Sequence, residues 1–327
     1  MVLAVSFRLP HWGISLVAGL AAAFAFLAGA SGILGFLLAN FAPLPLMIAS
    51  LGWGASSGGM ASAFAVALII SLTSFKLSLE FAALVAVPAV ILSVLAQWRK
   101  TFASSFYPFS RLLAWITWVS IFVSMVDIAI WSSQNGGYEA ASAEIAKRFQ
   151  PLLQEMFANG PQLPPSVGFE DIASVFAHAI PFVSTALQVM FFSGCLWIAA
   201  RVAHASGQLS RPFPEISAET ALPRDVLVIL ALAVGLLGGG MLVGSTSLAL
   251  ASGMIIIGII AAYALQGLAV IHFTSRKVPL RGVLLTLIYF GILFLSLWPL
   301  AIAAGIGFVD AFHPLRRGFP AAEDLKL

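Results

Sequence analysis

The sequence predicts an all-α fold: a polytopic transmembrane helical bundle of about eight to nine spans, with seven as the lower bound, and an extracytoplasmic amphipathic helix. Of the 327 residues, 61% are hydrophobic and only 9% are charged, and the mean hydropathy is +1.03. A soluble chain carries roughly 25% charged residues, so this one could not cover a water-facing surface. Its apolar residues fall in long runs, and each run in a bilayer must form helix to satisfy its own backbone. Soluble globular proteins are therefore excluded.

Nine apolar runs are candidate spans. They occupy residues 14–30, 32–50, 58–75, 79–97, 112–131, 175–200, 226–243, 250–273 and 282–308. The first run follows a single basic residue, Arg8, so an uncleaved first helix is favoured over a cleaved signal sequence. Pro43 and Pro45 interrupt the second run and predict a broken or partial span. In the ninth run Pro299 leaves two alternatives, a single span or a short hairpin that returns to its starting side.

Basic residues in three short loops predict the orientation of the bundle. They are Arg99, Lys100 and Arg111 in the first loop, Arg201, Arg211 and Arg224 in the second, and Arg276, Lys277 and Arg281 in the third. Short cytoplasmic loops are enriched in lysine and arginine, so all three loops are predicted to be cytoplasmic. Residues 132–174 are then extracytoplasmic. A single ninth span would place Arg316 and Arg317 outside, against this rule, whereas a hairpin would keep them inside. We expect a multi-pass protein of the bacterial cytoplasmic (inner) membrane.

The chain divides into four predicted parts. Residues 1–131 form an N-terminal membrane half of about five spans, 132–174 an extracytoplasmic amphipathic segment, 175–308 a C-terminal membrane half of about four spans, and 309–327 a polar tail. In the second part, apolar residues recur at spacings of three and four, which predicts a helix. They are Ile145, Phe149, Leu152, Leu153, Met156 and Phe157. This helix is either an interfacial helix or lid over an outer vestibule, or a helix that packs on the ends of the spans.

Polar residues inside the runs are the candidate substrate-binding residues. A charged group at mid-bilayer costs roughly 3 kcal/mol, which makes Asp127 a candidate for binding a cation or a proton, unless it reaches interfacial water. Asn40, Gln188 and Gln266 would either line a ligand pocket or donate hydrogen bonds to a neighbouring helix. His272, at the end of the eighth run, is expected at the interface.

Two further pairs are predicted to be structural. Gly235 and Gly239 lie four residues apart, a spacing that favours close helix packing, with a subunit interface or a gap facing the substrate as alternatives. Asp310 and Arg316 are close enough in sequence to pair at the membrane edge and anchor the C-terminus. As an exposed pair they would contribute less than about 1 kcal/mol.

The sequence carries no motif for catalysis. It contains no phosphate-binding loop ending in Gly-Lys-Ser/Thr, no His-Glu-x-x-His and no Gly-x-Ser-x-Gly. Its single cysteine, Cys195, lies in an apolar run, and no cluster of residues has metal-ligand spacing. We therefore predict no enzyme activity, no catalytic, cofactor-binding or metal-binding residue, no cofactor, and no nucleic-acid partner. Energy coupling would come from an ion gradient or from a partner subunit.

Three stretches resemble the YybS-like family of bacterial inner-membrane proteins. They are Ala42-Pro43-Leu44-Pro45-Leu46 followed by Gly52 and Gly54, the stretch from Gly267 to Phe273, and the stretch from Gly305 to Asp310 continued by Leu315-Arg316-Arg317. That family is similar in membrane architecture to the S-components of energy-coupling-factor transporters and to the rod-shape membrane protein of the elongation machinery. The resemblance implies a helical bundle with a small-molecule pocket or a scaffold role. It supplies no catalytic residue, and its matched positions are Gly267, His272, Asp310 and Arg316. The chain departs from an S-component in having more than six spans and the extra external segment.

Two functions follow from these observations. The first is a small-solute transporter or an S-component-like substrate-binding membrane subunit, with the lipid bilayer, a small organic solute and ATPase or transmembrane coupling subunits as partners. The alternative is a non-enzymatic scaffold or assembly protein of the bacterial cell envelope, with the proline-containing loop 201–224 as its docking surface. An intramembrane enzyme acting on lipid would need paired ionisable groups, and only Asp127 lies well inside a span. A transporter predicts a pocket into which Asn40, Gln188 or Gln266 points, and a scaffold predicts no cavity above about 300 Å³.

Overall fold

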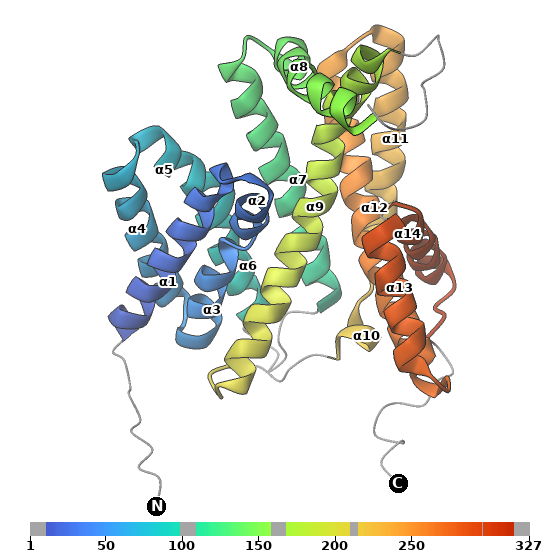
Figure 1. Ribbon diagram of the computed structural model, residues 1–327. Coiled ribbons are helices and arrows are strands. Elements are labelled where there is room, and N and C mark those ends of the chain that lie inside the picture. The colour runs from blue at the N-terminus through green and yellow to red at the C-terminus, as the bar shows by residue number, and fades with distance from the viewer. Residues whose placement is uncertain (1–10, 99–108, 158–167, 210–214, 296, 317–327) are drawn as a thin grey trace, which may run out of the picture.

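The computed structural model describes residues 11–98, 109–157, 168–209, 215–295 and 297–316. In these ranges every regular element is a helix and none is a strand (Figure 1). The α-helices are α1 (His11–Leu27), α2 (Gly32–Asn40), α3 (Pro43–Trp53), α4 (Ala55–Leu72), α5 (Phe75–Phe81), α6 (Val87–Gln97), α7 (Phe109–Gln134), α8 (Tyr138–Phe157), α9 (Phe169–Ala205), α10 (Ile216–Glu219), α11 (Asp225–Val243), α12 (Thr246–Thr274), α13 (Arg281–Leu295) and α14 (Leu297–Phe312). Within the described ranges, eight stretches are long and apolar enough to cross a membrane, which confirms the predicted helical bundle.

The second apolar run is broken, as predicted. Helix α2 ends at Asn40 and α3 begins at Pro43, with Phe41 and Ala42 between them. A proline fits the first position of a helix because the backbone N–H that it lacks has no partner there. Pro43 therefore begins α3, whereas the same proline inside a continuous helix would interrupt that helix.

The ninth apolar run forms two short helices, α13 and α14, that make a hairpin. Arg281, the first residue of α13, donates a hydrogen bond to the carbonyl of His272 near the end of α12. Arg316, just after α14, donates hydrogen bonds to the carbonyls of Ser217 and Ala218, and Ser217 also contacts Arg276 in the turn that follows α12. Both ends of the hairpin thus lie on one side of the bundle. Of the two alternatives left open by the sequence, the single ninth span is wrong.

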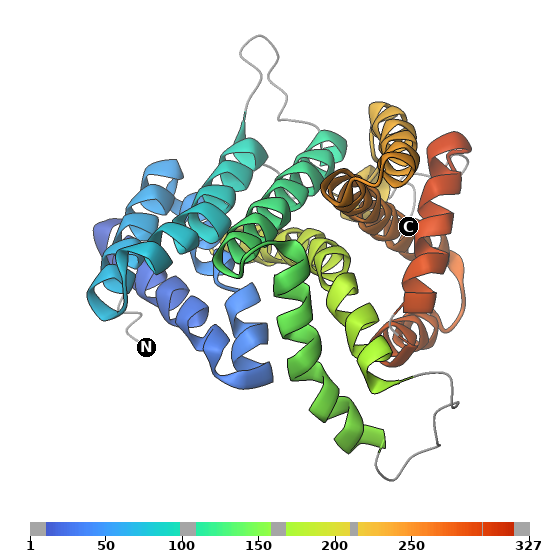
Figure 2. The same ribbon diagram turned by 90° about the horizontal axis from the view of Figure 1, so that it is seen from above.

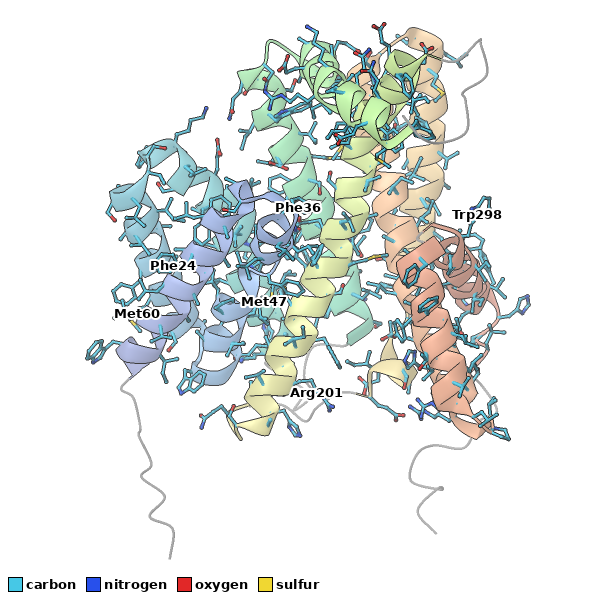
Figure 3. The ribbon with its side chains drawn as sticks, viewed as in Figure 1. Phe24, Phe36, Met47, Met60, Arg201 and Trp298 are labelled. Atoms are coloured by element: carbon cyan, nitrogen blue, oxygen red, sulfur yellow. The ribbon has the colours of Figure 1, made fainter. Side chains whose placement is uncertain are left out.

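We call the end of the bundle that carries Arg201, Arg224, Arg276, Arg281 and Arg316 the basic face. It lies at the bottom of Figure 1, and Arg201 is labelled there in Figure 3. The end that carries α8 is opposite and is called the α8 face (Figure 1). Arg99, Lys100, Arg211 and Arg317, which helped to predict the orientation, lie outside the described residues.

Helix α8 lies across the spans at the α8 face (Figure 1). Its Ala141 and Leu153 are buried against the bundle, whereas Phe149, Leu152 and Met156 are exposed. The predicted apolar face of α8 is therefore buried against the bundle at some positions and exposed at others. In the view of Figure 2, α8 extends outward from the end of α7 alongside the first part of α9.

Buried apolar side chains form two separate clusters. The first cluster joins α1, α3, α4 and α6 to the second half of α9, and the second joins α12 and α14 to the beginnings of α7 and α11. Helices α7 and α9 contribute to both clusters and lie between them (Figure 2). The chain thus has two hydrophobic cores that share two long helices.

Candidate functional site

A cavity of about 830 Å³ lies between the two hydrophobic cores. Pockets for small molecules fall in a range of about 300 to 1,000 Å³. Its apolar lining includes Leu51, Ala96, Leu112, Leu113, Ile116, Met190, Leu196, Trp197, Ala200, Leu209, Leu265, Leu268 and Ala269. Its polar lining includes Ser193, Arg201, Glu215, Ser217, Thr220, His272, Arg281 and Tyr289.

The cavity reaches from the basic face to about the middle of the membrane. Its lining follows α9 from Met190 to Arg201, a separation of eleven residues. At 1.5 Å per residue this is about 16 Å, roughly half of a 30 Å hydrocarbon core. Along α12 the lining likewise runs from Leu265 to His272, near the end of that helix.

Most of the polar lining lies at the basic face. The guanidinium of Arg201 stands 5.9 Å from the centre of the Trp197 ring. On the other side, the Nε2 atom of His272 lies 3.4 Å from the hydroxyl of Tyr289, and Nη2 of Arg281 lies 3.4 Å from the backbone oxygen of His272. Because these residues come from α9, α12 and α13, only the tertiary fold brings them together.

Helix α10 forms one polar wall of the cavity and is held there from two directions. Glu215 forms an ion pair with Arg276, which also donates a hydrogen bond to the hydroxyl of Ser217. Arg316 donates hydrogen bonds to the carbonyls of Ser217 and Ala218 at 3.1 and 3.0 Å. The Glu215 carboxylate is therefore paired with an arginine that is not part of the cavity lining.

A buried polar network lies behind this wall. The amide of Gln266 accepts a hydrogen bond from the backbone of Leu222 and donates one to the carboxylate of Asp310, both at 2.8 Å. Asp310 also pairs with Arg316 at 2.6 Å and accepts a hydrogen bond from the backbone of Leu315 at 2.9 Å. The side chain of Asp310 is only 2% exposed and that of Arg316 11%, in contrast to the exposed pair expected from the sequence.

At its deep end the cavity is bordered by Ser193 and Gly194 of α9. The hydroxyl oxygen of Ser193 is buried and has no hydrogen-bond partner among the described residues. A Cβ atom placed on Gly194 would meet nothing within 4 Å. This part of α9 therefore offers both an unsatisfied polar atom and open space.

The candidate residues chosen from the sequence lie in different places. Asn40 donates a hydrogen bond of 2.8 Å to the carbonyl of Phe36 in its own helix. Asp127 is exposed on α7, and Gln188 is half-buried on α9 with no hydrogen bond in the described part of the chain. None of these three, nor Gln266, lines the cavity. The cavity thus exceeds the size that a scaffold predicts, while its lining is not the one predicted for a transporter.

The close helix packing occurs at glycines other than the predicted pair. A Cβ atom on Gly235 or Gly239 would meet open space, so these residues pack against no helix in the described structure. A Cβ atom on Gly267 would instead lie 1.7 Å from the carbonyl oxygen of Ala303. On α14, a Cβ atom on Gly307 would lie 2.0 Å from the carbonyl oxygen of Tyr263 in α12.

Sequence reasoning missed the polar end of the cavity. Arg201 and Arg281 served only to predict the orientation, and His272 was expected at the interface. Aromatic and basic residues are common at the ends of membrane spans, so nothing local separates Trp197 or Tyr289 from ordinary interfacial residues. In the described residues no group of three or more histidine, cysteine or acidic side chains could hold a metal ion.

One protein family matches most of the chain. The family described as "Predicted membrane protein (DUF2232)" covers residues 19–311, from the first span to the end of α14. No curated protein and no solved structure matches the chain. Together with the eight membrane-spanning stretches, the match shows an integral membrane protein. The chain belongs to the DUF2232 family of predicted membrane proteins.

Proposed function

We propose that this protein is a non-enzymatic small-solute transporter, or the solute-binding membrane subunit of one, in the cytoplasmic membrane of a bacterium. The basic face lies in the cytoplasm, in agreement with the loop charges. The observation that carries the proposal is the cavity of about 830 Å³ that extends from this face to about mid-membrane. Its position corresponds to a site that is open toward the cytoplasm.

The two hydrophobic cores support transport rather than binding alone. Many transporters hold their solute near the membrane midplane, between two groups of helices that rock against each other. Here the cavity lies between two such groups, with α7 and α9 shared by both. Movement of the groups about these helices would expose the deep end of the cavity to the opposite side.

Energy for transport would come from an ion gradient or from partner ATPase subunits, because the sequence has no nucleotide-binding motif of its own. The resemblance to the YybS-like family and to S-components supports the second source.

The scaffold alternative has less support. Its proposed docking surface, the loop 201–224, contains α10, and the polar groups of α10 face arginines of this same chain. In its described part the loop forms a wall of the cavity. That arrangement suits a solute site better than a surface for recruiting proteins.

Cysteine accessibility tests the proposal without knowledge of the solute. In a Cys195→Ala background, Met190→Cys places a single thiol at the deep end of the cavity. We expect a membrane-impermeant maleimide to modify it in inside-out vesicles and, more slowly, in right-side-out vesicles. The matched control is Leu232→Cys near the middle of α11, a residue that is 62% exposed on the outside of the bundle and does not line the cavity, so it should react from neither side.

A variant that blocks the cavity shows whether the maleimide reaches Met190→Cys through it. Gly194→Phe fills the cavity from open space without displacing backbone, and Gly59→Phe makes the same change on α4, also in open space. Gly194→Phe should slow modification of Met190→Cys at least tenfold, whereas Gly59→Phe should leave it unchanged. Modification of Met190→Cys from the cytoplasmic side alone would contradict the proposal that the protein transports a solute. If Met190→Cys were modified from neither side, the proposal that an open cavity reaches this residue would be contradicted.

A further inference from the structure

We infer that the second half of α8 is an interfacial helix, whose apolar side inserts into the lipid leaflet at the α8 face. The partner of this surface is the lipid of the membrane that the protein spans. None of its residues lines the cavity, so its role does not depend on the proposed function. The two sides of α8, its depth and the aromatic residues beside it all support the same partner.

The apolar side of α8 is covered by the bundle in the first half of the helix and largely uncovered in the second. Ala141, in the first half, is fully buried. Phe149, Leu152 and Met156 are 37%, 54% and 75% exposed. With about 3.6 residues per turn, these three side chains fall within a sector of about 60° around the helix. The second half of α8 therefore presents one continuous apolar surface.

The charged residues of α8 lie on its other sides. Lys147 and Glu155 are exposed, and Arg148 forms a 3.2 Å ion pair with Glu144 in which the two side chains are 76% and 46% exposed. Lys147 is rotated by about 160° from Phe149. A helix with one apolar and one charged side, lying across the spans as α8 does in Figure 1, is typical of segments that rest in the membrane interface.

Contacts with α9 fix the depth of α8. The side-chain amide of Gln150 donates a hydrogen bond of 3.4 Å to the carboxylate of Glu170. Near the other end of α8, the carboxylate of Glu139 lies 3.4 Å from Nε2 of His178. Helix α8 therefore lies level with residues 170–178 of α9.

At this level the surface of α9 passes from polar to apolar. Glu170 and Asp171, in the first turn, are exposed. Only four residues after Asp171, Val175 is 70% exposed, and Phe176 is 52% exposed. Large apolar side chains on the outside of a membrane span are in contact with lipid tails, which are as apolar as they are. The lipid-contacting surface of the span thus reaches the depth at which α8 lies.

Aromatic residues mark the same boundary. Trp131 lies near the end of α7, and Tyr138 is the first residue of α8. The ring of Tyr138 packs edge-on against His178, with the ring centres 5.8 Å apart. Tryptophan and tyrosine are enriched where a membrane meets water, because one end of each ring is apolar and the other polar. Both residues place the join between α7 and α8 at this boundary.

Spin-label accessibility tests the inference. The full-length protein in the Cys195→Ala background carries one nitroxide at Leu152→Cys or Met156→Cys and is placed in phosphatidylcholine nanodiscs. We expect the ratio of collisions with oxygen, which concentrates in hydrocarbon, to collisions with a water-soluble nickel chelate to be about threefold or more above that at Glu155→Cys. Glu155→Cys is the matched control, since it lies on the charged side of the same turn. Val175→Cys is the reference for lipid contact.

Two results would overturn the inference. If the nickel chelate reached Leu152→Cys and Met156→Cys as often as Glu155→Cys, the apolar side of α8 would lie in water. If oxygen and the chelate both reached these two positions much less often than Glu155→Cys, protein would cover this side, either a second copy of the chain or another partner.

A charge on the apolar side provides a second measurement. Met156→Glu should raise the access of the nickel chelate to a label at Leu152→Cys about threefold or more, because a carboxylate is unfavourable in hydrocarbon and draws the helix out of the leaflet. Met156 is 75% exposed, so this change leaves the packed bundle intact. Gln154→Glu adds the same charge on the opposite side of the helix and should leave access unchanged. Equal effects of the two variants would contradict insertion of the apolar side.

Discussion

Gln266 of α12 and Asp310 of α14 are joined by a hydrogen bond of 2.8 Å from the side-chain amide of the first to the carboxylate of the second. Both residues are buried, with exposed fractions of 1% and 5%. Through Arg316 and the backbone of Leu222, the same pair holds the end of the hairpin and the segment after α10. One interior contact therefore fixes several elements at the basic face.

Asp310→Ala should destabilise the protein by about 3 kcal/mol, because it leaves the buried Arg316 guanidinium without its partner. The measurement is unfolding in detergent, followed by tryptophan fluorescence. The matched control is Asp225→Ala, an exposed acid in the first turn of α11, with an expected loss of about 0.5 kcal/mol. Equal losses for the two variants would show that the buried pair contributes nothing beyond an ordinary surface charge.

Gly267→Ala should separate α14 from α12, since the new methyl group would overlap the carbonyl of Ala303. We expect a loss of at least about 2 kcal/mol, comparable to overpacking of a core. Gly235→Ala makes the same change in open space and should be neutral or slightly stabilising, because alanine favours helix. Thermal stability in detergent, measured by size-exclusion chromatography after heating, compares the two variants. The packing assignment is wrong if Gly235→Ala is the more damaging.

Tyr263→Phe should leave stability unchanged or raise it by about 1 kcal/mol. Tyr263 is 2% exposed, and its hydroxyl has no hydrogen-bond partner among the described residues. Its ring packs edge-on against Phe308 at 5.6 Å, a contact that phenylalanine preserves. A clear drop in the unfolding temperature would reveal a partner for the hydroxyl, such as an ordered water.

The hairpin predicts the side on which α14 ends. In the Cys195→Ala background, Leu315→Cys and Ser206→Cys should react with an impermeant maleimide in inside-out vesicles. Ser133→Cys, at the end of α7, should react only in right-side-out vesicles. Reaction of Leu315→Cys together with Ser133→Cys would require α13 and α14 to cross the membrane as one span.

The apolar periodicity and the prolines made most of the fold predictable. The run of apolar residues from Thr246 to Thr274 can only be a span, and the break at Pro43 follows from a missing backbone donor. The hairpin at Pro299 was left as one of two alternatives, because its direction depends on contacts of Arg281 and Arg316 with distant parts of the chain. Local sequence does not encode those contacts.

The candidate site was much less predictable. Polarity inside a span selected Asn40 and Gln188, but polarity alone does not say whether a side chain faces a neighbouring helix or a cavity. Asn40 satisfies its amide within its own helix, and Gln266 satisfies its amide against Asp310. The cavity is lined instead by ordinary apolar residues and by arginines at the span ends.

Composition and hydropathy alone determined that this chain is a helical membrane protein, because a bilayer leaves a long apolar segment no other way to satisfy its backbone. The tertiary structure alone decided that the last apolar run turns back and that a cavity separates two hydrophobic cores. The reason is physical: hydrocarbon acts on every residue of a span alike, whereas a cavity exists only where side chains from several helices fail to fill the space between them.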